Sequence, residues 1–153
     1  MFGDRKAFPL FPNAAYDHDH GRVSPDGKWI AYQSAESGTG EVYITSFPGG
    51  IGKWQISSGG TTPPVAWRAD GKELYFVTLD GNLMTASIQE SAGSITVQGV
   101  RPLFRSPFLT ALVLTIFDVD PNDGQRFIGS AAPDTSSLPL NVITNWTAEL
   151  NKK

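Results

Sequence analysis

The 153-residue chain contains no cysteine. This absence excludes disulfides, thiolate metal sites and a cysteine nucleophile, and it leaves the redox compartment open. Charged residues are scarce at 18%, and the net charge is −3, so the basic stripe typical of nucleic-acid-binding proteins is missing. The most apolar stretch, residues 111–119, is too short to span a bilayer as a helix. We therefore expect neither a nucleic acid nor a membrane as partner.

We expect no signal peptide at the N-terminus, because Asp4, Arg5 and Lys6 stand where the apolar core of such a peptide would lie. The expected location is therefore the cytoplasm. An extracytoplasmic location fits if the sequence is part of a longer protein.

Tight-turn residues are abundant, with 16 glycines and 11 prolines, and aromatic residues make up 11% of the chain. This composition is typical of an all-β chain with many turns. No stretch has helical periodicity beyond a single turn near residues 148–150. The sequence therefore predicts the all-β class.

A turn-and-hairpin unit occurs three times, in residues 21–33, 65–77 and 117–128. Each unit has a short strand, a turn ending in Asp-Gly and a second strand rich in β-branched and aromatic residues. The three pairs are Asp26-Gly27, Asp70-Gly71 and Asp123-Gly124. Aspartate tolerates the bend, and glycine takes the positive φ that lets the second strand leave as a hairpin. We interpret these pairs as structural turns rather than catalytic residues.

The glycines of these pairs lie 44 and then 53 residues apart, which suits one four-stranded β-propeller blade per repeat. We predict an orphan outer strand at 6–11, blade 1 at 21–57, blade 2 at 64–105, and blade 3 at 115–146 without its outer strand. Within blade 2, residues 95–97 are expected to form a separate short strand in an insertion.

Three blades do not easily close a ring, since propellers typically have about four to eight. We expect half of a six-bladed ring formed by two chains, with the orphan strand of one copy completing blade 3 of the other. The alternative is that the chain is part of a longer protein.

Residues 21–34, with their Ser-Pro-Asp-Gly-Lys turn and Ile-Ala-Tyr strand, resemble the TolB-like propellers. Residues 52–57, 67–74 and 145–150 extend the resemblance, more narrowly to the C-terminal end of the propeller appended to some bacterial serine/threonine protein kinases. The resemblance implies a propeller that senses, binds ligands or scaffolds partners. It implies no kinase activity, because the kinase motifs are absent.

One local cluster has ligand-type side chains: Asp17, His18, Asp19 and His20. Two imidazoles and two carboxylates suit a divalent transition metal. However, alternate residues of a strand share one face, so His18 and His20 would need further ligands from elsewhere. A solvated loop is the alternative interpretation.

Asp118 and Asp120 alternate with Val119 on a predicted strand, so both would point the same way, toward the propeller channel. Paired carboxylates can do acid–base work. A polar channel lining explains them equally well.

No nucleophile elbow of the Gly-x-Ser-x-Gly type occurs. Trp29, Trp54, Trp67 and Trp146 are expected to pack between blades. The sequence thus predicts a non-catalytic propeller module without a cofactor, which forms a homodimer and binds a protein or small ligand at the channel. The alternatives are a metal-dependent hydrolase or lyase with a channel site, and the detached sensor domain of a kinase-type receptor.

Overall fold

The structure is a computed structural model that describes residues 7–12, 15–106, 117–120 and 122–130. Every regular element in this part is a β-strand, and every strand pairing is antiparallel. The predicted all-β class is confirmed for these residues. None of them forms a helix that is long and apolar enough to cross a membrane.

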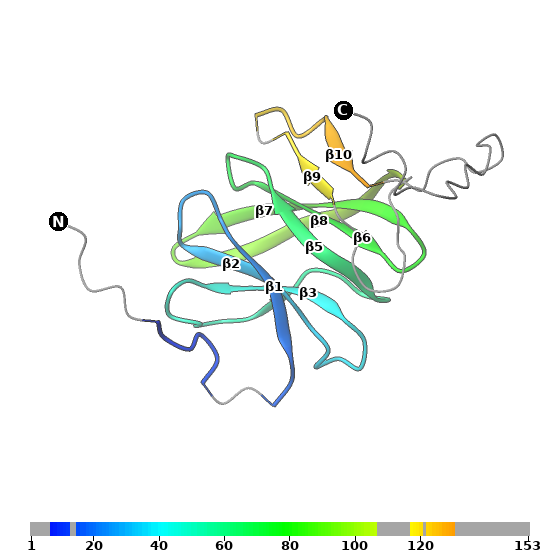
Figure 1. The fold of residues 1–153 in the computed structure, drawn as a ribbon. Coiled ribbons are helices and arrows are strands. Elements are labelled where there is room, and N and C mark those ends of the chain that lie inside the picture. The colour runs from blue at the N-terminus through cyan, green and yellow to red at the C-terminus, as the bar shows by residue number, and fades with distance from the viewer. Residues whose placement is uncertain (1–6, 13–14, 107–116, 121, 131–153) are drawn as a thin grey trace, which may run out of the picture.

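The first sheet, called sheet 1, is a meander of four strands in sequence order (Figure 1). Its strands are β1 (His18–Val23), β2 (Trp29–Ser34), β3 (Glu41–Ser46) and β4 (Trp54–Gln55). Strand β4 is shorter than the alternating pattern of residues 53–57 predicts.

Sheet 2 repeats the meander with β5 (Thr61–Trp67), β6 (Glu73–Thr78), β7 (Asn82–Ser91) and β8 (Ser94–Arg105). The prediction of a separate short strand at 95–97 was wrong. Those residues are part of β8, which pairs with β7 along its whole length. Register shifts after Leu83 and after Ser87 on β7 absorb the extra residues, so one long hairpin forms instead of an insertion.

A third unit begins with the hairpin of β9 (Phe117–Val119) and β10 (Phe127–Gly129). The remaining strands expected up to residue 146 fall outside the described residues. The number of blades therefore stays a prediction.

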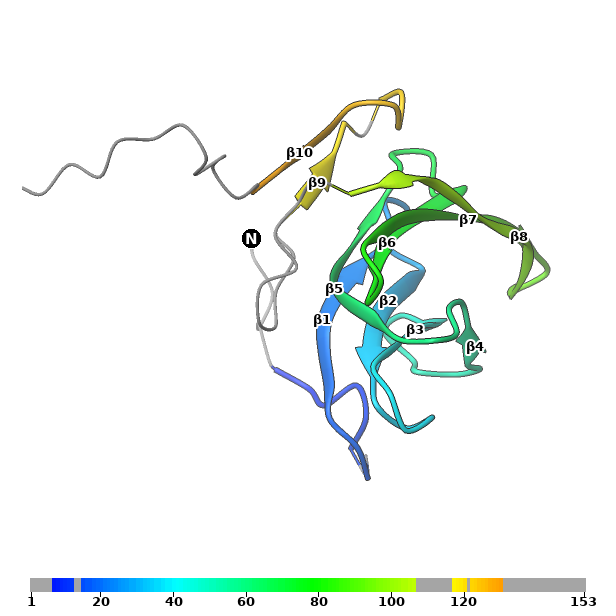
Figure 2. The ribbon, with the colours of Figure 1, turned by 90° about the vertical axis from the view of Figure 1, so that its right-hand side faces the viewer.

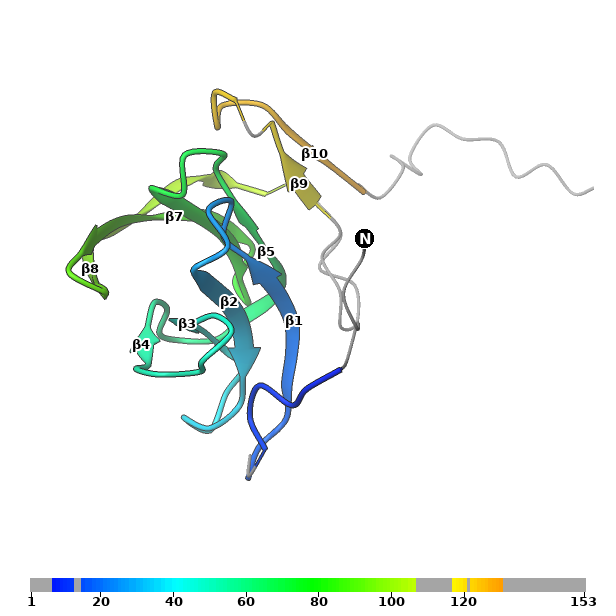
Figure 3. The same cartoon turned by 90° about the vertical axis from the view of Figure 1, so that its left-hand side faces the viewer.

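Sheets 1 and 2 pack face to face through one apolar core. Alternation along each strand sends one set of side chains into this core and the other set to the opposite face. Trp29, Ala31, Val42 and Ile44 of sheet 1 meet Leu74, Phe76, Ala86 and Ile88 of sheet 2 there. Figures 2 and 3 show the β7–β8 hairpin curving over this core toward β4.

The opposite face of sheet 2 is also covered. Tyr75, Val77 and Leu83 point away from sheet 1 and pack with Phe117 and Val119 of β9 in a second core. Sheet 2 is thus buried on both faces, as the middle layer of a stack of three.

The N-terminal segment differs in conformation from the orphan strand predicted at 6–11. Residues 7–11 form no strand in this structure. The Phe8 ring lies 6.3 Å from the Phe47 ring, and the Phe11 ring lies 4.9 Å from that of Tyr32. Pro9 has no N–H to donate to a strand ladder. The segment therefore packs across the far face of sheet 1 in its own chain.

Candidate functional site

The Asp-Gly turns of sheets 1 and 2 share one hydrogen-bond pattern. Asp26 Oδ1 accepts from the Lys28 amide at 3.2 Å, and Asp70 Oδ1 accepts from the Lys72 amide at 3.0 Å. Gly27 has a φ of 74°, a left-handed conformation that favours glycine. Each carboxylate is thus occupied in closing its own turn.

Hydrogen bonds lower the pKa values of both aspartates. The Ser24 hydroxyl donates to Asp26 at 2.6 Å, and this bond lowers the pKa of that carboxyl most. The Arg68 guanidinium donates to Asp70 at 2.9 and 2.8 Å, and these bonds lower the pKa of Asp70 most. Hydrogen bonding to the charged form favours that form, so the pKa of each carboxyl lies below its ordinary value in the folded chain.

The third turn keeps the aspartate bond but is one residue longer, since its glycine amide donates four residues back instead of three. Asp123 Oδ1 accepts from the Gln125 amide at 2.8 Å, and the Gly124 amide donates to the Asp120 carbonyl at 3.0 Å. An added Cβ at Gly124 would collide with the Tyr75 hydroxyl oxygen, so this turn sits directly against sheet 2.

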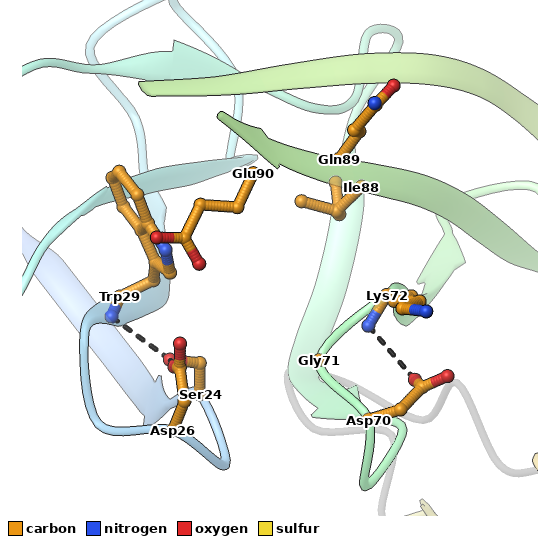
Figure 4. Close-up of a pocket in the computed structure, with 9 residues that line it drawn as sticks. All are labelled: Ser24, Asp26, Trp29, Asp70, Gly71, Lys72, Ile88, Gln89 and Glu90. Atoms are coloured by element: carbon orange, nitrogen blue, oxygen red, sulfur yellow. Dashed lines mark hydrogen bonds between the residues drawn. The ribbon is translucent and has the colours of Figure 1, made fainter. Parts of the chain in front are cut away.

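A groove of about 490 Å³ lies between the first two turns and strand β7, and we call it the first groove. This volume falls within the range of small-ligand sites. Figure 4 shows the residues that line it: Ser24, Asp26, Trp29, Asp70, Gly71, Lys72, Ile88, Gln89 and Glu90.

Three carboxylates line the first groove, and a lysine beside it bridges two of them. Lys28 Nζ lies 3.0 Å from Glu90 Oε1 and 3.4 Å from Asp26 Oδ2. The Glu90 contact joins the tip of the β7–β8 hairpin to the first turn, across 62 residues of sequence. Negative charge therefore exceeds positive charge on the walls of this groove.

The floor of the first groove includes Trp29, which is 6% exposed. Its backbone amide donates to Ser24 Oγ at 3.0 Å, while its buried indole Nε1 has no hydrogen-bond partner in the described part of the chain. A buried unpaired N–H is costly, so this donor lowers the stability of the folded chain.

A second groove, of about 420 Å³, lies one sheet further along, between sheet 2 and the third turn. It is lined by Arg68, Glu73, Tyr75, Arg101, Leu103, Phe104, Asp123, Gly124, Gln125 and Phe127. Each of the two grooves thus lies between neighbouring layers of the stack and next to an Asp-Gly turn.

The cluster at residues 17–20 does not converge on one point. His18 packs against aromatic rings, 4.4 Å from Phe11 and 5.2 Å from Tyr32. His20 has a φ of 51° within the register shift of β1, so the strand alternation that would align it with His18 is broken. His20 Nδ1 lies 3.0 Å from Asp19 Oδ1, and Asp17 is exposed.

Asp118 and Asp120, the second predicted pair, each accept a hydrogen bond from a different nearby amide. Asp118 Oδ1 accepts from the Val119 amide at 2.8 Å, while Asp120 Oδ1 accepts from the Asn122 amide at 2.9 Å. Arg126 also pairs with Asp120. Among residues 7–12, 15–106, 117–120 and 122–130, no group of three or more histidine, aspartate or glutamate side chains could hold a metal ion.

Sequence reasoning did not find the two grooves. The turn aspartates were identified, but their groove partners on β7 and β8 come from a hairpin that was expected to be interrupted. The one feature of the sequence that could have indicated the grooves is the repeat. Units of similar structure that stack on one another leave similar spaces between neighbouring layers.

Comparisons with known proteins give a fold likeness and nothing closer. No family model matches the chain, and no curated protein gives a significant match. The crystal structure of TolB from Acinetobacter baumannii superposes with a TM-score of 0.42 at 14% sequence identity. The match covers 79% of this chain and 39% of that chain, so the sequence spans well under half of the TolB structure.

Proposed function

We propose that this chain is a non-catalytic β-propeller module that binds a protein or a small ligand and completes its ring with a second copy. The supporting observation is the stack itself. Two four-stranded meanders pack face to face, and a third hairpin begins the next layer on the far side of sheet 2. Four-stranded meanders stacked in this way are the building units of propellers.

The two ends of the stack, as far as the described residues form it, support pairing with a second copy. At one end, beside sheet 1, Phe8, Tyr16 and Ile51 are 56%, 53% and 75% exposed. At the other end, Ile128 of β10 alternates with Phe127, which packs against the second core, and is 74% exposed. Large apolar side chains left in water at both ends favour a partner that covers them.

A two-fold pair would join the β10 end of each copy to the sheet 1 end of the other, which gives two identical junctions. Exchange of the N-terminal segment is not part of the proposal. Phe8 and Phe11 already pack against Phe47 and Tyr32 of their own chain, and exchange would require these contacts to be broken.

The ligand-binding part of the proposal rests on the grooves between the layers. The narrower relation to kinase-linked propellers, which the sequence resemblance implies, would make this binding a sensor function. Such a role needs a groove that accepts a ligand, and both described grooves have volumes suited to one.

The test of pairing is sedimentation velocity on the wild type and three lysine variants. Ile51→Lys and Ile128→Lys place a charge at the two proposed junctions. Leu79→Lys is the matched control, because Leu79 is 58% exposed and lies in the β6–β7 turn instead of at an end of the stack. We expect the two junction variants to sediment as monomers, while the control keeps the dimer.

Urea unfolding of each variant separates loss of pairing from loss of folding. A control that dissociates as much as the junction variants would contradict the proposed interface. So would junction variants that are folded and still sediment with the mass of the wild-type dimer.

A further inference from the structure

The second groove differs from the first in its charge. Arg68 forms ion pairs within its own sheet, since its guanidinium lies 2.8 Å from Asp70 Oδ2 and 3.2 Å from Glu73 Oε1. Asp123 is paired as well: it accepts a hydrogen bond from the Gln125 amide and lies 3.3 Å from Arg126 Nε. The lining charges of this groove are therefore mostly matched.

Arg101 is the exception. It is exposed on β8, and its guanidinium has no ion pair or hydrogen bond within the described part of the chain. Strand register places it opposite Thr85, which in turn lies opposite Tyr75. Arg101 thus stands in a row of side chains on the groove face of sheet 2, with all of its donors available.

Three aromatic rings line the same groove as Arg101. The Phe104 ring lies 5.6 Å from the Phe127 ring, and Tyr75 lies 5.4 Å from Phe127, both in edge-to-face geometry. Phe104 is 42% exposed, so part of the ring still faces solvent. The groove therefore offers an apolar contact surface next to an unmatched cation.

We propose that the second groove binds a ligand that has a carboxylate attached to an apolar body. Arg101 would take the carboxylate, because guanidinium donors match its two oxygens in a bidentate pair. The apolar body would lie against Phe104 and Phe127. The first groove suits such a ligand less well, because three carboxylates and one lysine line it, whereas two carboxylates and two arginines line the second groove.

This inference rests on the proposed binding function but not on ring closure. A chain that proves to be monomeric can still bind the ligand, and a dimer can still fail to bind it. The two proposals therefore fail in distinguishable ways.

Two sources can supply this ligand chemistry: the C-terminal carboxylate of a peptide ending in phenylalanine, and a free aromatic acid. The experiment is calorimetric titration of the full chain with acetyl-Gly-Gly-Phe, with its C-terminal amide, and with 3-phenylpropionate. We expect the peptide acid to bind about tenfold more tightly than the amide, since only the acid can pair with Arg101. Free phenylpropionate that binds as tightly as the peptide acid would indicate a small-molecule ligand.

The protein side is tested with Arg101→Gln and with Arg105→Gln as its matched control. Arg105 is exposed on the same strand and has the same charge, but it does not line the groove. We expect Arg101→Gln to weaken binding of the acid about tenfold, with Arg105→Gln unchanged. Equal binding of acid and amide by the wild type, equal effects of the two substitutions, or no binding of any probe would overturn the proposal.

Discussion

The indole nitrogen of Trp67 donates a hydrogen bond of 2.9 Å to the backbone carbonyl of Arg22. The two residues lie on β5 and β1, the first strands of their sheets, and are 45 positions apart in sequence. This bond fixes how one sheet sits against the next at the edge where the first strands meet. A second bond joins the same two sheets, since the Gln33 side-chain amide donates to the Thr61 carbonyl at 2.7 Å.

Trp67→Phe should therefore loosen the junction between the sheets. The substitution keeps an aromatic ring but leaves the Arg22 carbonyl without this donor, which should lower the free energy of unfolding by about 1 kcal/mol. Trp54→Phe serves as the control, because Trp54 packs 5.5 Å from Trp29 in the same core and makes no such bond in the described structure. Urea unfolding in which the two variants lose the same stability would argue against the role of the bond.

The left-handed glycine of the first turn gives a second prediction. Gly27 has a φ of 74°, and nothing would meet an added Cβ within 4 Å, so Gly27→Ala tests backbone strain alone. We expect a loss of about 1 kcal/mol. Gly99→Ala also has open space but no positive φ, and should cost nothing. Thermal unfolding of both variants checks this, and an unaffected Gly27→Ala would show that the turn tolerates a side chain.

The buried carboxylate of Glu41 gives a third prediction. Glu41 is 2% exposed, and its oxygens accept from the Gly60 amide at 2.7 Å and from the Ser57 hydroxyl. In Glu41→Gln the amide offers a donor where an acceptor is needed, which should cost about 1–3 kcal/mol. Glu36→Gln breaks an ion pair with Lys53, whose side chain is half exposed, and should cost less. Chemical denaturation that ranks the two variants the other way would refute this assignment.

Acid stability follows from the turn aspartates. The pKa of Asp70 is lowered from 3.8, chiefly by its hydrogen bond from Arg68. The unfolded chain therefore takes up the proton first as the pH falls, and the stability present above pH 3.8 is lost as the pH falls through the lowered pKa. Asp70→Asn should be less stable than the wild type near neutral pH, with a difference that shrinks in acid.

Urea midpoints measured from neutral pH down to acid pH test this dependence. Asp17→Asn, which alters an exposed carboxylate outside the turns, is the control and should follow the wild type throughout. A stability difference for Asp70→Asn that stays constant with pH would show that this carboxylate is not linked to acid unfolding.

Local pattern predicted most of the strands. Residues 29–33 and 73–77 alternate between two faces and follow an Asp-Gly turn, so short-range chemistry is sufficient to define β2 and β6. The β7–β8 hairpin was harder. The prediction placed residues 95–97 in a separate strand, because the register shifts that let residues 95–105 pair as one strand leave no local pattern in the sequence.

The N-terminal segment and the grooves were beyond sequence reasoning for the same reason. Residues 7–11 have the composition of a strand, yet their place is set by the rings of Phe47 and Tyr32 on another part of the chain. Arg101 looks like an ordinary surface residue in the sequence. It stands out only because Arg68, its neighbour in the groove, is already paired with Asp70 and Glu73.

We propose that a second copy completes the ring, and the mass of the full chain in solution tests this pairing most directly. Light scattering coupled to size exclusion should give twice the 16.5 kDa of one chain across the micromolar range. A mass of 16.5 kDa at every concentration would contradict the account.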